Sequence, residues 1–564
     1  MRTRRLLFIA TIASGLVFLS QAASAQTRNQ AQAPAALTGQ VSSTEEGPME
    51  GVLVTAKKTG STIAITVVSD EQGRYRFPSA KLGPGHYEMS IRAVGYDLDG
   101  PAAVDIGAQR AATADLKLRK TANLAAQLTN AEWIESAPST RDQKIFLGTC
   151  SVCHTLLRPI SSTHNVDEFI KVQERMASYT NQSIPEFPQP RIAQRLADQT
   201  EQKAEGGQSR LQQSRREMAE FLSSINLSKS PVWSYPLKTF PRPTGRATRV
   251  IITEYDLPKP TRQPHDVIVD SDGIVWYDSF GEQVLGKLDP KTGKTTEFQV
   301  PVLKSNSPKG DLALRTDEDG NLWIGMLQQG AAGKFDRKTG TFQTYSLPPE
   351  FEKDYTQINQ VDAYHSKVDG RAWVHESGTF SLHRLDPVTG QFEDFQPFPQ
   401  PSPNIYDVIS DAQNNAYFTV SGNDQIGYID VKTKKITLYK TPTADSGPRR
   451  GSLDSRGRVW FGEFRGNRIG MFDPETQRIQ EWVPPTPWAY PYDVVADKNG
   501  EAWAGSVFTD RVTRLDPKTG QMTDYLLPRN TNIRRTFVDN STTPVTFWVG
   551  NNHGASIIKL EPLD

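Results

Sequence analysis

The sequence predicts a multidomain, mainly β protein: a small β-sandwich, then an α-helical domain, then a seven-bladed β-propeller closed by its N-terminal strand. Three observations carry this prediction. Near the N-terminus, apolar residues alternate with period two, as in half-buried strands. In the middle of the chain, apolar residues recur at helical spacing instead. The C-terminal half repeats a turn followed by an aromatic residue at intervals in the forties, a period typical of propellers.

The composition narrows the class of protein. The chain has 564 residues, which is too long for one compact domain. Its 64 Lys and Arg balance 64 Asp and Glu, and no run of like charge points to a nucleic-acid partner. The 41 glycines and 38 prolines favour a turn-rich β protein over a helical one.

The N-terminus has the features of a secretory signal. A basic start (MRTRR) precedes an apolar stretch over 6–19, and Ala23-Ser24-Ala25 forms a cleavage site. We therefore predict a signal peptide over 1–25 and a periplasmic or secreted protein. An uncleaved anchor is the alternative, but the apolar stretch is short. No later segment reaches the roughly 20 apolar residues that a membrane helix needs, so stable membrane insertion is not expected.

Residues 36–118 are predicted to form the sandwich. Short strands around Val41, Val54 and Phe77 are separated by glycine and proline, and VGY at 94–96 ends the set. This pattern resembles the carboxypeptidase regulatory-like domain, a transthyretin-like fold. The resemblance implies an accessory module that binds a carbohydrate-like ligand. A spacer without a ligand is the alternative.

Residues 126–228 are predicted to form the helical domain. Helices are expected through 141–147, near 166–178 and at about 208–225. The proline-rich segment 229–247 is predicted to be an extended linker to the propeller at 248–564.

The only two cysteines of the chain lie in one short motif, CSVCH, which supplies Cys150, Cys153 and His154. A c-type haem needs two thiols to bond its vinyl groups and a histidine to bind iron from the same side. The motif therefore predicts one covalent haem c. A redox dithiol is the alternative, but it needs no histidine. With its helical surroundings the segment resembles a cytochrome c domain, in which His154 would be the proximal ligand and both cysteines the thioether anchors.

The sixth iron ligand is left open between three choices. Met176, in VQERMASY, resembles the methionine of haem domains with a similar short helix. His164 competes with it, and an open position is the third choice. Methionine ligation would raise the reduction potential, which suits a haem that accepts electrons.

The propeller repeat also predicts how the ring closes. Each complete copy ends in a strand such as TEFQVP, but the last copy ends at 559–562 without one. The matching piece, TEYDLP at 253–258, stands before the first copy. The N-terminal strand is therefore expected to complete the last blade, which would remove exposed strand edges.

Copies such as PHDVIVDSDGIVWYDS and GNRIGMFDPETQRIQEW resemble the virginiamycin B lyase (streptogramin lyase) family. The resemblance implies magnesium and a catalytic pair, a histidine beginning an inner strand and a glutamate fourteen residues later. His265 holds the histidine position, but Ser279 stands where its glutamate should be. Glu463 and Glu376 hold the glutamate position in other copies, and Arg449 replaces the histidine of Glu463. No copy keeps both residues.

The start of each inner strand is expected at one channel mouth, where arginines and tyrosines would favour an anionic or phenolic ligand. The alternative is that these side chains only fill the mouth. Besides His265 they are Tyr406, Arg449, Arg450, Tyr492, Arg534 and Arg535. Aspartates occupy the next position in five copies: Asp266, Asp311, Asp362, Asp407 and Asp493. We expect these carboxylates to accept hydrogen bonds from their own turns. A Mg²⁺ or Ca²⁺ site is the alternative.

The leading functional prediction is an exported haem protein that transfers electrons or oxidises a substrate at the mouth. It would need a small-molecule substrate and an electron-transfer partner protein. The alternatives are a streptogramin-type lyase with an appended haem and a non-enzymatic binding protein. The candidate catalytic residues are His265, Glu463, Arg449 and Arg450. Because a general base must reach its proton, the divided pair predicts negligible streptogramin cleavage.

Overall fold

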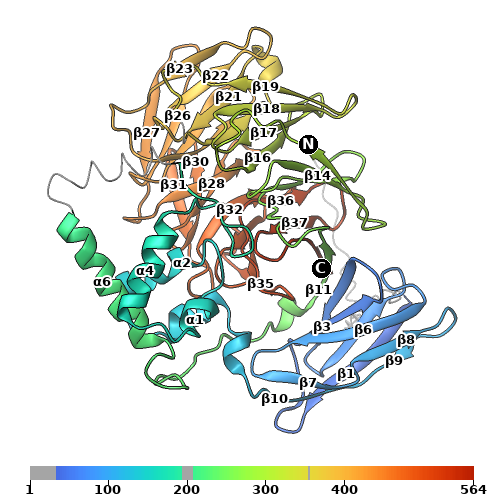
Figure 1. The fold of residues 1–564 in the computed structure, drawn as a ribbon. Helices are drawn as coiled ribbons and strands as arrows, with labels where there is room; N and C mark the ends of the chain where they lie inside the picture. Colours follow the sequence, from blue (N-terminus) through green and yellow to red (C-terminus); the bar gives the residue numbers. More distant parts are fainter. Residues whose placement is uncertain (1–33, 193–207, 354–355) are drawn as a thin grey trace, which may run out of the picture. The chain divides into compact units, whose positions relative to one another are not determined.

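The computed structural model describes residues 34–192, 208–353 and 356–564 (Figure 1). The predicted signal peptide lies outside these residues. The described helices are α1 (Asn130–Ser136), α2 (Arg141–Cys150), α3 (Leu157–Ile160), α4 (Val166–Ala177) and α6 (Gln208–Ile225), with short 3-10 turns at Leu124–Gln127, Gly245–Thr248 and Ser366–Val368. None of the helices in this part of the chain is long and apolar enough to cross a membrane.

The N-terminal part is a β-sandwich, as predicted. Its alternating sequence places one face of each strand inside, where Val54, Phe77 and Leu116 are buried in a common core. The strands are β1 (Ala35–Ser43), β2 (Gly47–Pro48), β3 (Leu53–Lys58), β4 (Ile63–Val68), β5 (Arg74–Pro78), β6 (Gly85–Arg92), β7 (Tyr96–Gly100), β8 (Ala103–Ile106), β9 (Ala112–Thr113) and β10 (Leu116–Lys120). One sheet has the order β2-β1-β10-β7, with β5 and β9 also paired to β1.

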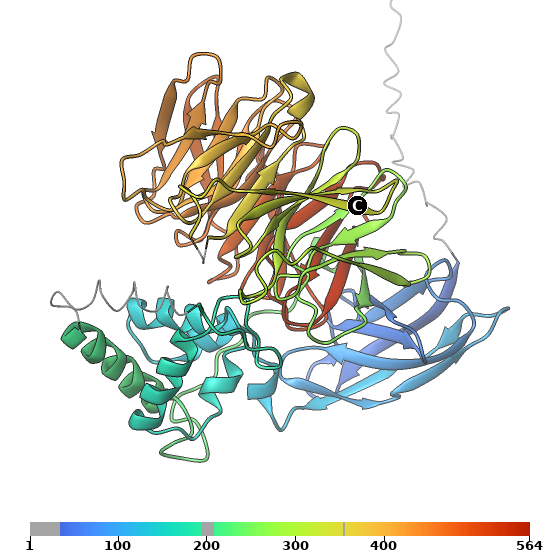
Figure 2. The same ribbon diagram turned by 45° about the horizontal axis from the view of Figure 1, so that its top comes forward.

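The repeat folds into successive antiparallel sheets of a β-propeller, which stand side by side in Figures 1 and 2. Each of the first six sheets contains four consecutive strands. The first three are β12 (Val267–Val269), β13 (Val275–Tyr277), β14 (Val284–Leu288), β15 (Thr295–Gln299); β16 (Asp311–Thr316), β17 (Leu322–Met326), β18 (Ala331–Asp336), β19 (Thr341–Ser346); and β20 (Ile358–Asp362), β21 (Ala372–Glu376), β22 (Leu382–Leu385), β23 (Phe392–Phe395). The next three are β24 (Ile405–Ser410), β25 (Ala416–Val420), β26 (Gln425–Ile429), β27 (Ile436–Lys440); β28 (Pro448–Leu453), β29 (Val459–Glu463), β30 (Arg468–Asp473), β31 (Arg478–Trp482); and β32 (Pro491–Ala496), β33 (Ala502–Ser506), β34 (Arg511–Leu515), β35 (Met522–Leu526).

The last repeat is built differently. Its strands β36 (Thr536–Asp539), β37 (Thr546–Asn551) and β38 (Ser556–Pro562) are joined by the N-terminal strand β11 (Val250–Asp256). Strand β11 pairs antiparallel with β38 from Val250–Pro562 to Asp256–Ser556, as the missing strand of the last copy predicts. The opposite edge of β11 pairs with β4 of the sandwich, from Ile251–Val67 to Tyr255–Ile63.

The predicted fold class is therefore wrong about closure. No sheet of the described chain closes on itself, and the seventh set of strands does not end as a separate blade. It continues into the sandwich as one eight-stranded sheet, β36-β37-β38-β11-β4-β3-β6-β8. The physical reason is the free edge of β11, whose N–H and C=O groups need partners that β4 supplies.

The prediction of a helical cytochrome c domain is wrong as well. The described helices do not enclose a core of their own, because their apolar residues pack against the propeller. Leu147 of α2 and Phe169 of α4 lie in one buried cluster with Tyr492 and Phe508 from the sixth sheet and its loops. Helical spacing in the sequence predicted the helices correctly. It did not predict that their apolar faces pack against the propeller.

Candidate functional site

The structure brings together the side chains predicted for the channel mouth. His265 lies just before β12, Tyr406 in β24, Arg449 in β28, Tyr492 in β32 and Arg534 just before β36. They come from five different repeats of the propeller, and each stands at or near the start of an inner strand. The equivalent position in these five repeats therefore reaches the same place, which is why the sequence period predicted the group.

His265 is a buried, oriented imidazole. Its Nδ1 contacts a carboxylate oxygen of Asp266, and its ring lies 4.9 Å from the ring of Phe280. Burial lowers the pKa of His265 to about 4; Asp266 opposes this shift, whereas Arg450 and Arg534 add to it. The imidazole is therefore neutral at pH 7. With Nδ1–H donated to the carboxylate, Nε2 carries the free lone pair.

Two tyrosine hydroxyls lie near His265 and contact each other. The Tyr492 hydroxyl lies 3.5 Å from Nε2 of His265 and 2.6 Å from the hydroxyl of Tyr406. Burial raises the pKa of Tyr406 above its ordinary value. Burial acts the same way on Tyr492, but nearby guanidinium groups outweigh it and the pKa of Tyr492 is lowered. The two phenols thus differ in acidity although they share a hydrogen bond.

Arg449 lies among aromatic rings. Its Cζ is 3.5 Å from the ring centre of Phe464, 5.0 Å from that of Tyr406 and 5.1 Å from that of Tyr492. Ring faces stabilise the cation without using its N–H groups. Within the described ranges no carboxylate forms an ion pair with Arg449. Its donors can therefore bind the carboxylate or phenolate of a ligand.

The aspartates that follow the mouth residues join neighbouring sheets. Three of them accept an N–H from the inner strand of the next sheet. Asp362 also accepts the N–H of Tyr364 at 3.1 Å, which is the bond to its own turn that the sequence predicted. The donors from the next sheet are Ser410 for Asp362 (3.0 Å), Gly451 for Asp407 (3.1 Å) and Thr536 for Asp493 (3.0 Å). Arg315, Arg450 and Arg535 lie beside the same carboxylates. In the described chain, no group of three or more His, Cys, Asp or Glu side chains is arranged to hold a metal ion.

Glu463 and Glu376, the glutamates at the position of the lyase family's catalytic glutamate, both lie apart from His265. Glu463 is fully buried, and neither of its carboxyl oxygens has a hydrogen-bond partner among the residues that the structure describes. Burial raises the pKa of Glu463 to about 9, with Glu481 adding to the shift. Glu376 accepts backbone N–H groups from Thr379 and Ser381. Among the contacts of the described residues, no hydrogen bond or ion pair joins either glutamate to His265.

The CSVCH motif begins at Cys150, the last residue of α2. Both thiols are free. His154 is half-buried, and its Nδ1 lies 3.0 Å from the carbonyl oxygen of Thr155. A histidine that donates Nδ1–H to a carbonyl keeps the Nε2 lone pair free for a metal. The residues of the motif therefore fit a covalently attached haem.

The motif lies directly on the propeller. Asn532 donates to the carbonyl of Ser151 at 3.2 Å, and Arg534 donates to that of Val152 at 3.4 Å. His553 Nε2 also reaches the Val152 carbonyl, at 3.1 Å. Because Arg534 also flanks Tyr492, with its Cζ 5.5 Å from the ring centre, the motif and the mouth are neighbouring sites.

The two candidates for the sixth iron ligand lie on or beside α4. Met176 is 37% exposed. His164 precedes the helix, lies 3.8 Å from a Glu168 oxygen and packs edge-on to Phe169. The hydrogen bonds and ring contacts of the described residues connect neither side chain to the motif.

Two buried glutamines anchor the segment after α4 on the other side of the mouth. Gln189 donates to the carbonyl of Gly281 at 2.9 Å, and Gln182 accepts from Gln263 at 3.0 Å and from Gln328 at 2.9 Å. This contact cannot be predicted from the sequence. Glutamines in a polar segment carry no periodic signal, so only the tertiary structure identifies them.

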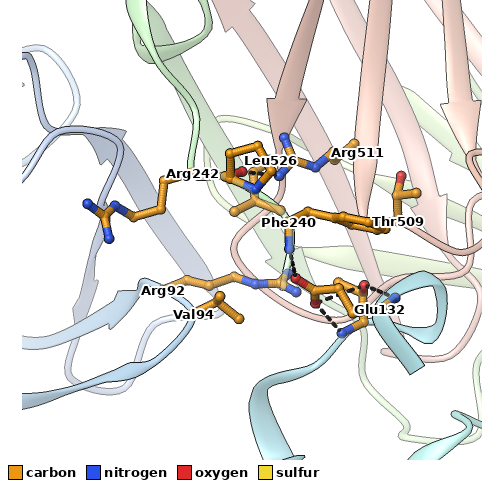
Figure 3. Close-up of a pocket in the computed structure, with 10 residues that line it drawn as sticks. Arg92, Val94, Glu132, Phe240, Arg242, Thr509, Arg511 and Leu526 are labelled. Atoms are coloured by element: carbon orange, nitrogen blue, oxygen red, sulfur yellow. Dashed lines mark hydrogen bonds between the residues drawn. The ribbon is translucent and has the colours of Figure 1, made fainter. Parts of the chain in front are cut away.

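A small pocket lies away from the mouth, where the sandwich, α1, the linker and the sixth sheet meet (Figure 3). Arg92, Phe240 and Arg511 line it, and Glu132 accepts the backbone N–H of Phe240 at 2.7 Å. None of the predicted catalytic residues lines this pocket, which belongs to the junction between parts of the chain.

The propeller region and the sandwich match two different protein families. Residues 243–450 match the virginiamycin B lyase family, and residues 36–119 match the carboxypeptidase regulatory-like domain. The chain contains a domain of each family. The lyase-family domain includes His265 and Arg449, whereas neither match includes the CSVCH motif.

Solved structures resemble the lyase-family domain. A streptogramin B lyase is 23% identical over 57% of this chain and 100% of that one, with a TM-score of 0.49. The virginiamycin B lyase of Staphylococcus aureus is 22% identical over 55% of this chain and 99% of that one, with a TM-score of 0.48. A catalytically inactive variant of the latter, solved with quinupristin, gives the same values. No curated protein matches the chain.

Proposed function

We propose that the lyase-family domain is an acid–base enzyme that removes a proton from an anionic ligand at the channel mouth. The contact series from Asp266 through His265 and Tyr492 to Tyr406 carries this proposal. It is the lyase alternative of the sequence analysis, and the family match over 243–450 supports it over the redox prediction.

The arrangement can bind and orient a ligand before any chemistry occurs. Arg449, whose N–H groups face no carboxylate of the described chain, would pair with a carboxylate or phenolate of the ligand. The tyrosine rings would pack against an aromatic part of it. Asp266 fixes the ring of His265, so the proton-accepting nitrogen points toward Tyr492 rather than away from it.

The proposed reaction is an elimination. A C–H bond of the ligand breaks, the proton passes to a basic atom of the site, and the electron pair forms a C=C bond as the leaving group departs with its own pair. No oxidant is required. The family's glutamate partner for the histidine is absent from the mouth, so the substrate need not be a streptogramin.

The test is an absorbance assay on the purified full chain. A streptogramin and a panel of aromatic acid esters would be followed for the ultraviolet band of the new double bond. We expect turnover of at least one anionic ester and a loss of about 100-fold or more in His265→Ala, because a positioned acid–base group is worth that much. His86→Ala, an exposed histidine of the sandwich, is the control. Equal rates in both variants would contradict the proposal.

A covalent haem c at Cys150 and Cys153, with His154 on the iron, is the second candidate function. The free thiols and the Nδ1–carbonyl contact of His154 support it. When bound, a haem would supply one-electron transfer, so this proposal includes an electron-transfer partner protein. It also includes export of the chain, which the N-terminal signal sequence predicts. The residues of this chain would anchor the group and set its ligand field; the acid–base chemistry of the mouth does not depend on it.

A further inference from the structure

We propose that Tyr406 is the catalytic residue that takes the proton from the ligand, and that this proton moves inward through Tyr492 to His265. The inference rests on the acid–base function proposed above and names the group that touches the ligand. In this order of events Tyr492 is protonated in the resting site and acts as a carrier, and His265 is the final acceptor. The burial of the mouth residues and the directions of their hydrogen bonds support it.

A covering segment, residues 130–192, lies across part of the channel mouth. It contains the CSVCH motif and the glutamines that follow α4. Hydrogen bonds join it to residues beside the first, second, sixth and last sheets of the propeller: Gln263, Gly281, Gln328, Phe508, Asn532 and Arg534. On these sides of the mouth, His265 is 1% exposed and Tyr492 is 3% exposed. A ligand therefore cannot reach either of them directly from solvent.

The accessible members of the mouth group come from the fourth and fifth sheets. Tyr406 on β24 and Arg449 on β28 are both partly exposed. The Cζ atom of Arg449 lies 5.0 Å from the ring centre of Tyr406, so the two side chains border the same space. A ligand whose anionic group pairs with Arg449 would therefore meet Tyr406 before it could meet Tyr492.

The directions of three hydrogen bonds leave the Tyr406 oxygen as an acceptor. His265 donates Nδ1–H to Asp266, so its Nε2 carries a lone pair. The Tyr492 hydroxyl, 3.5 Å from Nε2, therefore donates to that nitrogen. Its oxygen can then only accept the hydroxyl of Tyr406, which is 2.6 Å away. All three protons point toward Asp266, and the Tyr406 oxygen keeps lone pairs for a proton from the ligand.

In the proposed step, a C–H bond of the ligand breaks and its proton bonds to the Tyr406 oxygen. The Tyr406 proton moves to Tyr492, and the Tyr492 proton moves to Nε2 of His265. Each phenol loses one proton as it gains another, so only His265 changes its charge, and Asp266 pairs with the imidazolium. The C–H electron pair forms the C=C bond, and the leaving group departs with its own pair. Return of the proton to the leaving group restores the site.

Ligand binding tests the acceptor role of Tyr406 without any turnover. Calorimetric titration of the full chain would compare mandelate, which carries a hydroxyl beside its carboxylate, with phenylacetate, which lacks that donor. We expect mandelate to bind up to about tenfold more tightly, the effect of one hydrogen bond. Tyr406→Phe should bind the two acids equally. Tyr439→Phe, on the outer strand of the same sheet, is the control and should keep the preference.

Kinetics test the path of the proton with any ester that the full chain turns over. Tyr406→Phe and Tyr492→Phe should each lower kcat by about 100-fold or more and leave KM nearly unchanged, because the ring and the Arg449 contact remain. The double variant should lose no more than either single variant, because the same path is interrupted once or twice. A merely structural role would instead change KM and give additive losses.

Equal binding of both acids to the wild type, a mandelate preference that survives Tyr406→Phe, or a wild-type kcat in Tyr406→Phe would overturn the inference. If Tyr406→Phe does not fold, a wild-type kcat in Tyr492→Phe would overturn it equally. A mandelate preference without turnover of any ester would contradict the proposed function alone. Turnover that depends on His265 but not on Tyr406 would contradict this inference alone.

Discussion

His553 Nε2 lies 3.1 Å from the carbonyl oxygen of Val152, so a histidine of the last repeat contacts the centre of the CSVCH motif. The two residues are far apart in sequence. Together with the contacts of Asn532 and Arg534, this pair places the motif at the channel mouth. A group attached at the cysteines would therefore lie next to the acid–base residues.

The first prediction concerns covalent haem. Protein exported in a host with a cytochrome maturation system should keep its haem on a denaturing gel, because thioether bonds survive unfolding. Cys150→Ala with Cys153→Ala should abolish the haem stain, and Met176→Ala should leave it unchanged. A colourless wild-type band would refute haem attachment.

The second prediction concerns the sixth ligand. If Met176 binds the iron, Met176→Ala should remove the near-infrared sulfur-to-iron band of the oxidised protein and lower the reduction potential. The exposure of Met176 means that it must turn inward to do so. His164→Ala is the matched variant, and loss of the band there but not in Met176→Ala would reverse the assignment.

The third prediction concerns the strand that joins the sandwich to the propeller. Ile251 of β11 is buried in the sandwich core although it belongs to the last propeller sheet. Ile251→Ala should lower the free energy of unfolding by roughly 2–4 kcal/mol, the cost of such a cavity. Because β11 pairs with both β38 and β4, calorimetry should show the sandwich and the last sheet melting together.

Val388, which is 93% exposed, supplies the control for this change. Val388→Ala should alter stability by less than about 0.5 kcal/mol. Two separate transitions, with only one of them moved by Ile251→Ala, would show that the sheet across β4 and β11 is not a cooperative unit.

The fourth prediction concerns Glu463, whose pKa burial raises to about 9. At neutral pH the Glu463 carboxyl is protonated in the folded chain. In the unfolded chain the same carboxyl loses its proton above its ordinary pKa of 4.5. Stability from this group is therefore complete below about pH 4.5 and is lost as the pH rises toward 9. Glu463→Gln removes that loss and should stabilise the protein at pH 7 by up to about 3 kcal/mol.

Chemical denaturation at acid and neutral pH would measure this effect. The gain from Glu463→Gln should shrink toward zero near pH 4. A variant that is less stable than the wild type at pH 7 would contradict the prediction that the buried Glu463 carboxyl destabilises the folded chain at that pH.

Local pattern determined most of the fold. Period-two alternation predicted the sandwich, the repeat predicted the propeller sheets, and the missing strand of the last copy predicted that β11 pairs with β38. The same period predicted that His265, Tyr406, Arg449, Tyr492 and Arg534 share one mouth. These features depend on which residues recur at which interval, and a sequence records that directly.

The tertiary structure decided what the repeats and helices pack against. Periodicity shows that a strand has a free edge or a helix an apolar face, but it does not name the partner that covers it. The pairing of β11 with β4 and the core shared by Phe169 and Phe508 are therefore visible only in the fold. The same holds for the 2.6 Å contact between Tyr406 and Tyr492, because the acidity of each phenol is set by the charges that folding places around it.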